Sequence, residues 1–293
     1  EPAARRNEVL AFLRGGVVDI SVSRPAARAP GWGIPVPDDP EQVVYVWWDA
    51  LANYITALDD EEAFRTWWCE SAERVHVIGK GILRFHTVHW LALLASHGLP
   101  LPTTVFVHEY LTVDGFKISK SRGDGVDAVA LVDRFGVDAL RWWLLREVTG
   151  GADTDFTTRR LVQRADRELA NGLGNLVNRT VSLVGRSGVE VSDGADDVVP
   201  DFRAAARALP GRIDEALGRF DFAAATEVIW QVVQEGNRAV ERERPWELIR
   251  QPDDRRLAAV LAGLLDACRL LVAECAPFLP DGTARLSRQL AGD

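Results

Sequence analysis

Lysine is rare in this chain, and its positions point to chemistry on phosphate groups. The 293 residues include 34 basic side chains, of which only Lys80, Lys117 and Lys120 are lysines. Two of them belong to the segment 117–121, which reads Lys-Ile-Ser-Lys-Ser, and Lys80 lies between two glycines. Ammonium groups, hydroxyls and flexible glycines predict a cradle for a polyphosphate. The spacing of a P-loop is absent, and a generic surface loop is the alternative interpretation.

Strands that alternate with helices are predicted to position these lysines. We expect a first helix at 6–14, strands at 43–48, 74–78 and 103–107, and helices at 49–58, 82–97 and 126–148. Such alternation is typical of a parallel, doubly wound sheet, which binds ligands at the C-terminal ends of its strands. Trp47, Gly79 and His108 are therefore expected near that edge.

The pattern changes after Asp155, where only helical periodicity remains. Helices are expected at 158–184, 202–216, 223–241 and 255–271. We therefore predict an α/β domain at 1–155, followed by an all-α helical bundle at 156–293.

Composition excludes several classes of protein. With 47% hydrophobic residues the chain has the composition of a globular protein, and no apolar run approaches the roughly 18 residues of a membrane span. The three cysteines form no Cys-x-x-Cys pair, which argues against a disulfide framework or a zinc knuckle. A net charge of −9 argues against non-specific nucleic-acid binding, although it does not exclude a local site that recognises a nucleic acid. We expect a cytoplasmic enzyme with no metal site in this part of the chain.

The segment 117–121 resembles the Lys-Met-Ser-Lys-Ser signature of class I aminoacyl-tRNA synthetases, with Ile118 in the methionine place. Further blocks, in the same order along the chain, resemble the methionyl-tRNA synthetase family. They lie at 44–51, 76–80, 84–86, 138–141, 173–179 and 244–248. The resemblance implies the second half of a Rossmann-type parallel nucleotide-binding fold at 1–155, with a stem-contact region at about 110–155. It implies an α-helical anticodon-binding domain at 156–293.

The resemblance also implies roles for single residues. The positions that match the methionine site are Trp47, Ala50, Tyr54, Ile82, His86 and Trp90. An aromatic slot suits a thioether, and three of these residues are spaced for one helical face. Without the resemblance, core packing would be the preferred interpretation of this stripe.

The phosphate and anticodon sites follow in the same way. The resemblance implies that ATP, with Mg²⁺, is bound by Gly79, Lys80, Lys117, Ser119, Lys120 and Ser121. Lys117 and Lys120 are the predicted catalytic residues, because ammonium groups stabilise charge that develops on phosphate oxygens. Asn175, Arg179 and Trp246 match the residues that read the CAU anticodon of tRNA(Met). The alternative interpretation of these three residues is structural, as an N-terminal helix cap and a buried tryptophan.

The chain departs from the family pattern at two places. The His-Ile-Gly-His signature of the first half of the fold is absent, so we expect that half to be missing from this chain or supplied separately. Gly81 stands where many family members have an acidic residue that can bind the ATP ribose, so we assign Gly81 no such role.

The resulting prediction is a methionine–tRNA ligase that forms methionyl-adenylate and charges tRNA(Met), with the isolated chain inactive. Two alternatives stay open: a paralogue that activates an amino acid for biosynthesis without charging tRNA, and a tRNA-binding remnant without catalysis. The presence of the anticodon residues favours the ligase.

Overall fold

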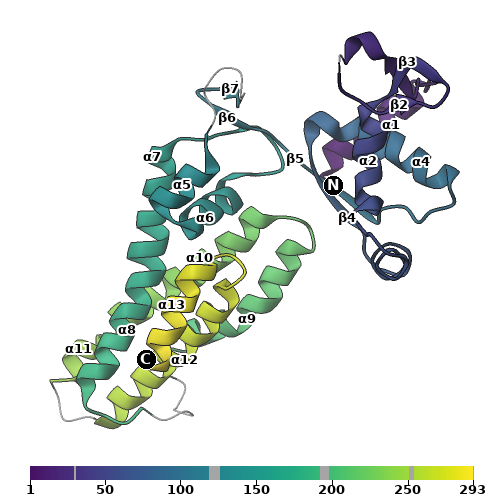
Figure 1. Ribbon diagram of the computed structural model, residues 1–293. Helices are drawn as coiled ribbons and strands as arrows, with labels where there is room; N and C mark the ends of the chain where they lie inside the picture. The colour runs from purple at the N-terminus through teal and green to yellow at the C-terminus, as the bar shows by residue number, and fades with distance from the viewer. Residues whose placement is uncertain (30, 119–125, 192–197, 251–253, 293) are drawn as a thin grey trace. The chain divides into compact units, whose positions relative to one another are not determined.

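The computed structural model describes residues 1–29, 31–118, 126–191, 198–250 and 254–292. The chain forms two compact units, Glu1–Glu109 and Tyr110–Asp293, which we call unit 1 and unit 2 (Figure 1). None of the described helices is long and apolar enough to cross a membrane.

Unit 1 combines two small sheets with short helices. One sheet is antiparallel, in the order β1-β3-β2, and the other is the parallel pair β4-β5. Its elements are α1 (Ala3–Arg14), β1 (Ser23–Pro25), η1 (Ala26–Arg28), β2 (Pro35–Val36), β3 (Asp39–Val44), α2 (Val46–Thr56), α3 (Glu61–Ala63), η2 (Phe64–Cys69), β4 (Val75–Gly79), η3 (Lys80–Ile82), η4 (Phe85–His89), α4 (Trp90–Ser96) and β5 (Thr104–His108).

The predicted strand at 43–48 is wrong beyond Val44. Strand β3 ends there, pairs antiparallel with β1 and β2, and is followed by helix α2, which includes Trp47. The apolar run joins the end of a strand to the first turn of a helix whose inner face carries Trp47, Leu51 and Tyr54. That spacing has the helical period and not the strand period. Trp47 therefore does not lie at a strand end.

The parallel pair confirms the other two predicted strands. Five residues of β4 pair with five of β5, ending with Gly79 opposite His108. Along β4, His76 and Ile78 are buried, whereas Val75 and Val77 are 40% and 62% exposed. Parallel strands are normally covered on both faces. Within the described residues, one face of β4 is exposed, whereas Phe106 and Val107 of β5, which point to opposite faces, are both buried.

Unit 2 begins with a three-stranded sheet in the order β7-β6-β8 and continues as a helical bundle. Its elements are β6 (Leu111–Val113), β7 (Phe116–Lys117), α5 (Ala128–Phe135), α6 (Val137–Glu147), β8 (Thr154–Asp155), α7 (Thr158–Arg164), η6 (Ala165–Gly174), α8 (Asn175–Ser187), α9 (Pro200–Leu217), α10 (Phe222–Glu243), α11 (Pro245–Leu248), α12 (Asp254–Cys275) and α13 (Pro280–Ala291).

The single helix predicted at 126–148 is divided in two. Gly136, between α5 and α6, has a φ of 83°. Only glycine adopts this conformation at low cost, and it interrupts the helical hydrogen bonds. The prediction of helix was therefore right on either side of Gly136 and wrong at that residue.

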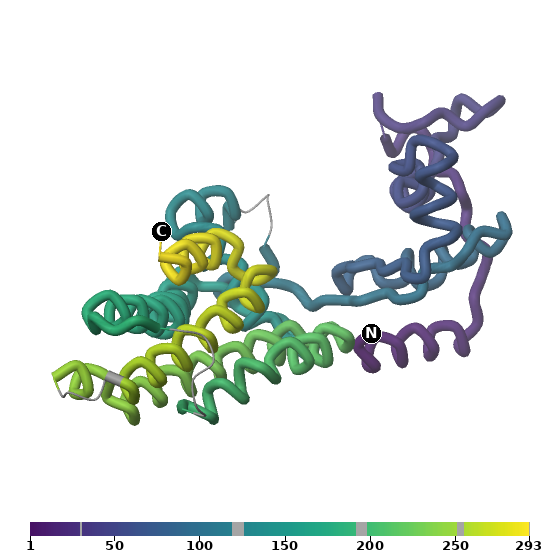
Figure 2. Tube along the Cα trace, turned by 90° about the horizontal axis from the view of Figure 1, so that it is seen from below, coloured from purple at the N-terminus to yellow at the C-terminus, as the bar shows by residue number. Residues whose placement is uncertain are grey.

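The bundle confirms the all-α prediction for the second part of the chain. Helices α9, α10 and α12 pack against one another, and α7, η6 and α8 follow one another without a break (Figure 2). The core includes Leu176, Phe202, Ile229 and Leu264, all fully buried. Every regular element described after Asp155 is a helix.

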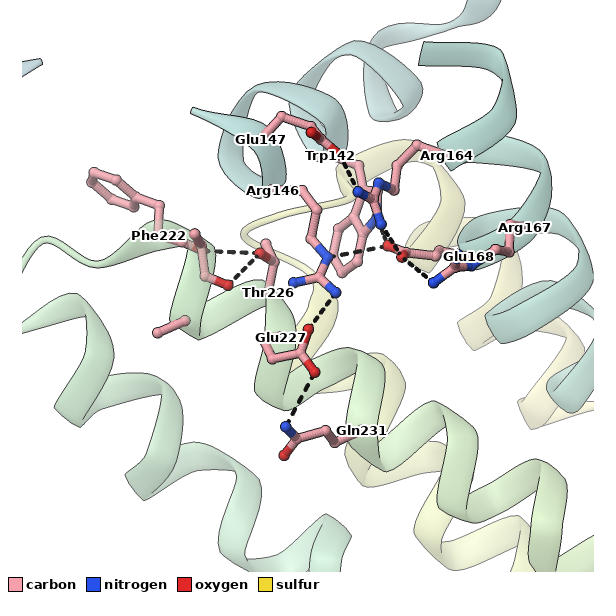
Figure 3. A network of polar contacts seen from close by, with 12 residues as sticks. Trp142, Arg146, Glu147, Arg164, Arg167, Glu168, Phe222, Thr226, Glu227 and Gln231 are labelled. Carbon is pink, nitrogen blue, oxygen red and sulfur yellow. Dashed lines mark hydrogen bonds and ion pairs between the residues drawn. The ribbon is translucent and has the colours of Figure 1, made fainter. Parts of the chain in front are cut away.

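Polar groups buried in unit 2 join α6 to the bundle. The Glu168 carboxylate, 1% exposed, accepts hydrogen bonds from Trp142 Nε1 at 2.8 Å and Arg146 Nε at 3.3 Å. Arg164 donates to it at 2.5 Å. Arg146 also pairs with Glu227 on α10. Figure 3 shows these side chains converging from α6, the α7–η6 segment and α10.

The boundary between the compact units lies before the predicted functional boundary at 155/156. Strand β8, which ends at Asp155, pairs with β6, and α6 packs against α10. Residues 110–155 therefore belong to the same compact unit as the bundle. The functional division at 155/156 stays a prediction.

Candidate functional site

The C-terminal edge of β4 and β5 carries the first group of predicted residues. Gly79 is the last residue of β4, and Lys80 begins the next helical turn. His108 ends β5 opposite Gly79, so both lie at the edge where a parallel sheet binds ligands. The Lys80 ammonium lies 3.0 Å from the Glu109 carboxylate. The structure thus places Gly79 and Lys80 where the sequence predicted them.

Lys117 lies at the end of a tight hairpin in unit 2. Asp114 and Gly115, both with positive φ, form the two-residue turn between β6 and β7. Asp-Gly is the preferred sequence for such a turn. The exposed Lys117 follows, with its Nζ 4.1 Å from the centre of the Tyr110 ring. Ser119, Lys120 and Ser121 lie outside the described residues.

Asp155 is hydrogen-bonded to the first strand of this hairpin and to its turn. Its Oδ1 accepts hydrogen bonds from Gly115 N at 2.9 Å and Thr112 Oγ1 at 2.8 Å. The Gly115 amide, more than the Thr112 hydroxyl, lowers the pKa of Asp155. A carboxylate thus holds β6 and the turn that precedes β7.

Four of the predicted methionine-site residues gather in one aromatic cluster of unit 1. The Tyr54 hydroxyl lies 2.8 Å from His86 Nε2. The Trp47 ring meets His86 edge-on at 6.4 Å between centroids, and the Trp90 ring lies 6.0 Å from Tyr54. Trp90 is buried, whereas Trp47 and Tyr54 are half-buried. Two helices, α2 and the helical segment 82–96, therefore supply one aromatic surface.

The other two predicted methionine-site residues stand apart from this cluster. Ala50 is exposed on α2. The Ile82 side chain packs against Ile78, Leu83 and Val107 beside the parallel strands. Only the backbone carbonyl of Ile82 reaches the cluster, 3.0 Å from His86 Nδ1.

His76 and Phe85 belong to the same cluster but were not predicted as site residues. His76 on β4 accepts a hydrogen bond from Trp90 Nε1 at 3.0 Å, and its ring lies 4.2 Å from that of Tyr54. The Phe85 ring stacks on Trp47, with centroids 3.9 Å apart. Both belong to the blocks 76–80 and 84–86 that carry the family resemblance. The sequence signal that could have identified His76 as a site residue is its inward-facing position in the strand pattern.

The hydrogen bonds assign a proton to each histidine. His86 Nδ1 donates to the Ile82 carbonyl, so Nε2 accepts from the Tyr54 hydroxyl. His76 Nε2 accepts from Trp90, so its proton lies on Nδ1. Burial, followed by the charge of nearby His86, lowers the pKa of His76 to about 4. Burial also lowers the pKa of His86 against the raising effect of the Ile82 carbonyl. Both rings are therefore neutral at pH 7.

A neutral aromatic surface of this kind has a definite chemistry. Indole, phenol and imidazole rings present polarisable faces to a thioether or another soft apolar group. The Tyr54 hydroxyl and His86 supply a polar contact without a net charge. The surface therefore suits an uncharged, flexible side chain.

Two of the predicted anticodon residues meet in unit 2. The Arg179 guanidinium lies 5.5 Å from the centre of the Trp246 ring and 2.8 Å from a Glu241 oxygen. Asn175, the first residue of α8, is exposed four residues before Arg179 and shares its helix face. A half-buried tryptophan beside an arginine can stack on an unpaired base.

Known proteins are similar to this chain over nearly its whole length. The family described as tRNA synthetases class I (M) matches residues 1–181. The methionine–tRNA ligase of Caldanaerobacter subterraneus subsp. tengcongensis is 41% identical over 99% of this chain and 46% of its own length. That of Synechocystis sp. is 39% identical over 99% of this chain and 56% of its own length. The chain thus spans about half the length of the curated relatives it matches.

A solved structure agrees over nearly the whole chain. Mycobacterium tuberculosis methionyl-tRNA synthetase, in complex with methionyl-adenylate, is 36% identical with a TM-score of 0.89. The match covers 98% of this chain and 57% of the other. The α/β portion is therefore half of a Rossmann-type fold, and a helical domain follows it. From the family match, these relatives and this fold, we conclude that the chain belongs to the class I tRNA synthetases of the methionine type.

Proposed function

We propose that this chain provides part of a methionine–tRNA ligase, which activates methionine with ATP and transfers it to tRNA(Met). The observation that carries the proposal is the neutral aromatic cluster of Trp47, Tyr54, His86 and Trp90 in the same unit as the Gly79–Lys80 strand edge. The aromatic cluster would receive a thioether side chain, and the strand edge would receive a nucleotide. The proposed setting is the cytoplasm.

In the proposed reaction, the methionine carboxylate attacks the α-phosphate of ATP and pyrophosphate leaves. Lys80, Lys117 and Lys120 would stabilise the charge on the phosphate oxygens, together with Mg²⁺ bound to ATP. Gly79 would let the phosphates approach the backbone, and Ser119 and Ser121 would donate hydrogen bonds to them. The chain spans about half of its relatives' length. Activity is therefore proposed for the complete protein and not for these 293 residues by themselves.

The bundle would supply tRNA recognition. Arg179 and Trp246 are already in contact, and Asn175 lies on the same helix face as Arg179. We assign these three residues to the CAU anticodon, whose unstacked bases offer faces for stacking and edges for hydrogen bonds.

The test measures methionine-dependent exchange of pyrophosphate into ATP in the full-length gene product. Lys120→Ala should reduce the exchange rate about a hundredfold or more, because one group that stabilises the transition state is lost. Its effect on methionine binding should be far smaller. Arg219→Ala, on an exposed arginine of unit 2, is the control. Exchange at the wild-type rate in Lys120→Ala would refute the assignment.

A second measurement on the same samples tests the tRNA part of the proposal. Trp246→Ala should reduce charging of tRNA(Met) while leaving pyrophosphate exchange unchanged. Exchange without any charging by the wild-type protein would instead indicate a paralogue that activates an amino acid. Binding of tRNA with neither activity would indicate a non-catalytic protein.

A further inference from the structure

A buried carboxylate lies at the strand edge beside Lys80. Glu109 directly follows β5, and Lys80 directly follows β4, with the paired residues Gly79 and His108 just before them. The Glu109 side chain is only 4% exposed. The parallel pairing therefore brings together two charged residues that are distant in sequence.

Each oxygen of Glu109 is engaged by a different cation. Oε2 lies 3.0 Å from the Lys80 ammonium. Oε1 accepts from Arg5 on α1, at 3.0 Å from Nε and 2.5 Å from Nη2. Arg5 in turn donates to Glu8 at 2.8 Å. Burial acts to raise the pKa of Glu109, but the hydrogen bonds from Arg5 and Lys80 outweigh it and hold the pKa below its usual value. The carboxylate is therefore ionised at neutral pH.

This arrangement restricts a side chain that is otherwise flexible. A lysine carries its ammonium on a four-carbon stem with several rotatable bonds. Glu109 is held from behind by the two-pronged contact with Arg5, so it offers Lys80 a fixed anchor. An ammonium that is already oriented loses less conformational freedom when it meets an anion.

We propose that Glu109 is a positioning residue, which holds the Lys80 ammonium at the strand edge in the orientation that meets the phosphates of ATP. The inference rests on the proposed function, because it takes this edge as the nucleotide site. Glu109 itself need not touch the nucleotide. It acts through Lys80.

A purely structural role predicts something different. Glu109 would then only dock α1 through Arg5, and its loss would affect folding but not the response to ATP. Arg5→Gln is the comparison variant, because it removes the other cation of the same carboxylate but keeps both Lys80 and Glu109, and so should weaken the anchor without removing it.

The experiment measures pyrophosphate exchange in the full-length gene product, with ATP and methionine varied separately. Glu109→Gln keeps the shape of the side chain but removes its charge. It should lower kcat/KM for ATP about ten- to a hundredfold, because the ammonium is misplaced. The KM for methionine should not change. Arg5→Gln should affect the ATP parameters much less than Glu109→Gln.

A double-mutant cycle decides whether Glu109 acts through Lys80. In a Lys80→Ala background, Glu109→Gln should have no further effect on kcat/KM for ATP. If the two effects multiply instead, the positioning role is overturned. Should Glu109→Gln fail to fold, Glu109→Asp retains the charge but shortens the anchor, and wild-type ATP parameters in that variant would also overturn the proposal.

Pyrophosphate exchange by the wild-type protein distinguishes a failure of this inference from a failure of the proposed function. Absence of methionine-dependent exchange in the wild type would refute the proposed function. Normal exchange in the wild type, together with unchanged ATP parameters in Glu109→Gln, would refute only the role of Glu109.

Discussion

Removing the Glu168 carboxylate should destabilise unit 2, because three buried or half-buried side chains donate hydrogen bonds to it. The carboxylate accepts from Trp142, Arg146 and Arg164, and Arg167 lies 3.6 Å away. Trp142 is 2% exposed, so its indole N–H is a buried donor that loses its acceptor. An orphaned buried donor costs about 1–3 kcal/mol. Breaking a buried ion pair by removing one partner typically costs about 3–5 kcal/mol in total.

We therefore expect Glu168→Ala to lower the free energy of unfolding by about 3–5 kcal/mol. Glu168→Gln retains an acceptor for Trp142 but loses the charge, and should cost about 1.5–3 kcal/mol. The assay is equilibrium urea unfolding at pH 7, followed by circular dichroism, because unit 2 holds most of the helices. Glu168→Ala should therefore lose more unfolding free energy than Glu168→Gln.

The control is an exposed pair on the same unit. Glu215 and Arg219 form an i,i+4 contact in which the side chains are 71% and 58% exposed. Glu215→Ala should change the unfolding free energy by less than about 1 kcal/mol. If Glu168→Ala lost no more than Glu215→Ala, the buried network would contribute nothing to the attachment of α6, and the reasoning from burial would fail.

Two further predictions concern the cores of the units. The pKa of His76 is lowered by burial from 6.5 to about 4, so the unfolded state binds a proton that the folded state does not in this range. The stability of unit 1 should therefore be complete above about pH 6.5 and fall with decreasing pH toward 4, by at most about 1.4 kcal/mol per pH unit. Urea titrations across this range should show a shallower slope for His76→Gln, and an equal slope would contradict the assignment. In the bundle, a Cβ on Gly236 would lie 2.6 Å from Leu176, so Gly236→Ala should destabilise by about 1–3 kcal/mol. Gly211 on α9 faces open space, and Gly211→Ala should stabilise by about 0.5–1 kcal/mol; thermal unfolding that moved both variants in the same direction would refute the packing argument.

Local patterns predicted much of the fold. The helices of the bundle follow from apolar residues at the helical period, and the strands at 74–78 and 103–107 follow from short β-branched runs. The same reasoning failed at 43–48, where a strand passes into a helix within one apolar run. It also failed at Gly136, whose positive φ divides a helix that the periodicity joins. Hydrophobic periodicity alone contains no information about where the backbone changes direction.

Residue type and local spacing alone identify residues that can do chemistry: the rare lysines, and the aromatic residues of α2 and the segment 82–96. These depend on residue type and on spacing within one element, which are local properties. The packing of the elements establishes that His76 accepts from Trp90, and that Glu109 lies between Lys80 and Arg5. It also decided that Ile82 packs beside the strands and contributes only its carbonyl to the cluster. Contacts between distant residues depend on which elements pack together and on what water is excluded, and these are properties of the whole fold.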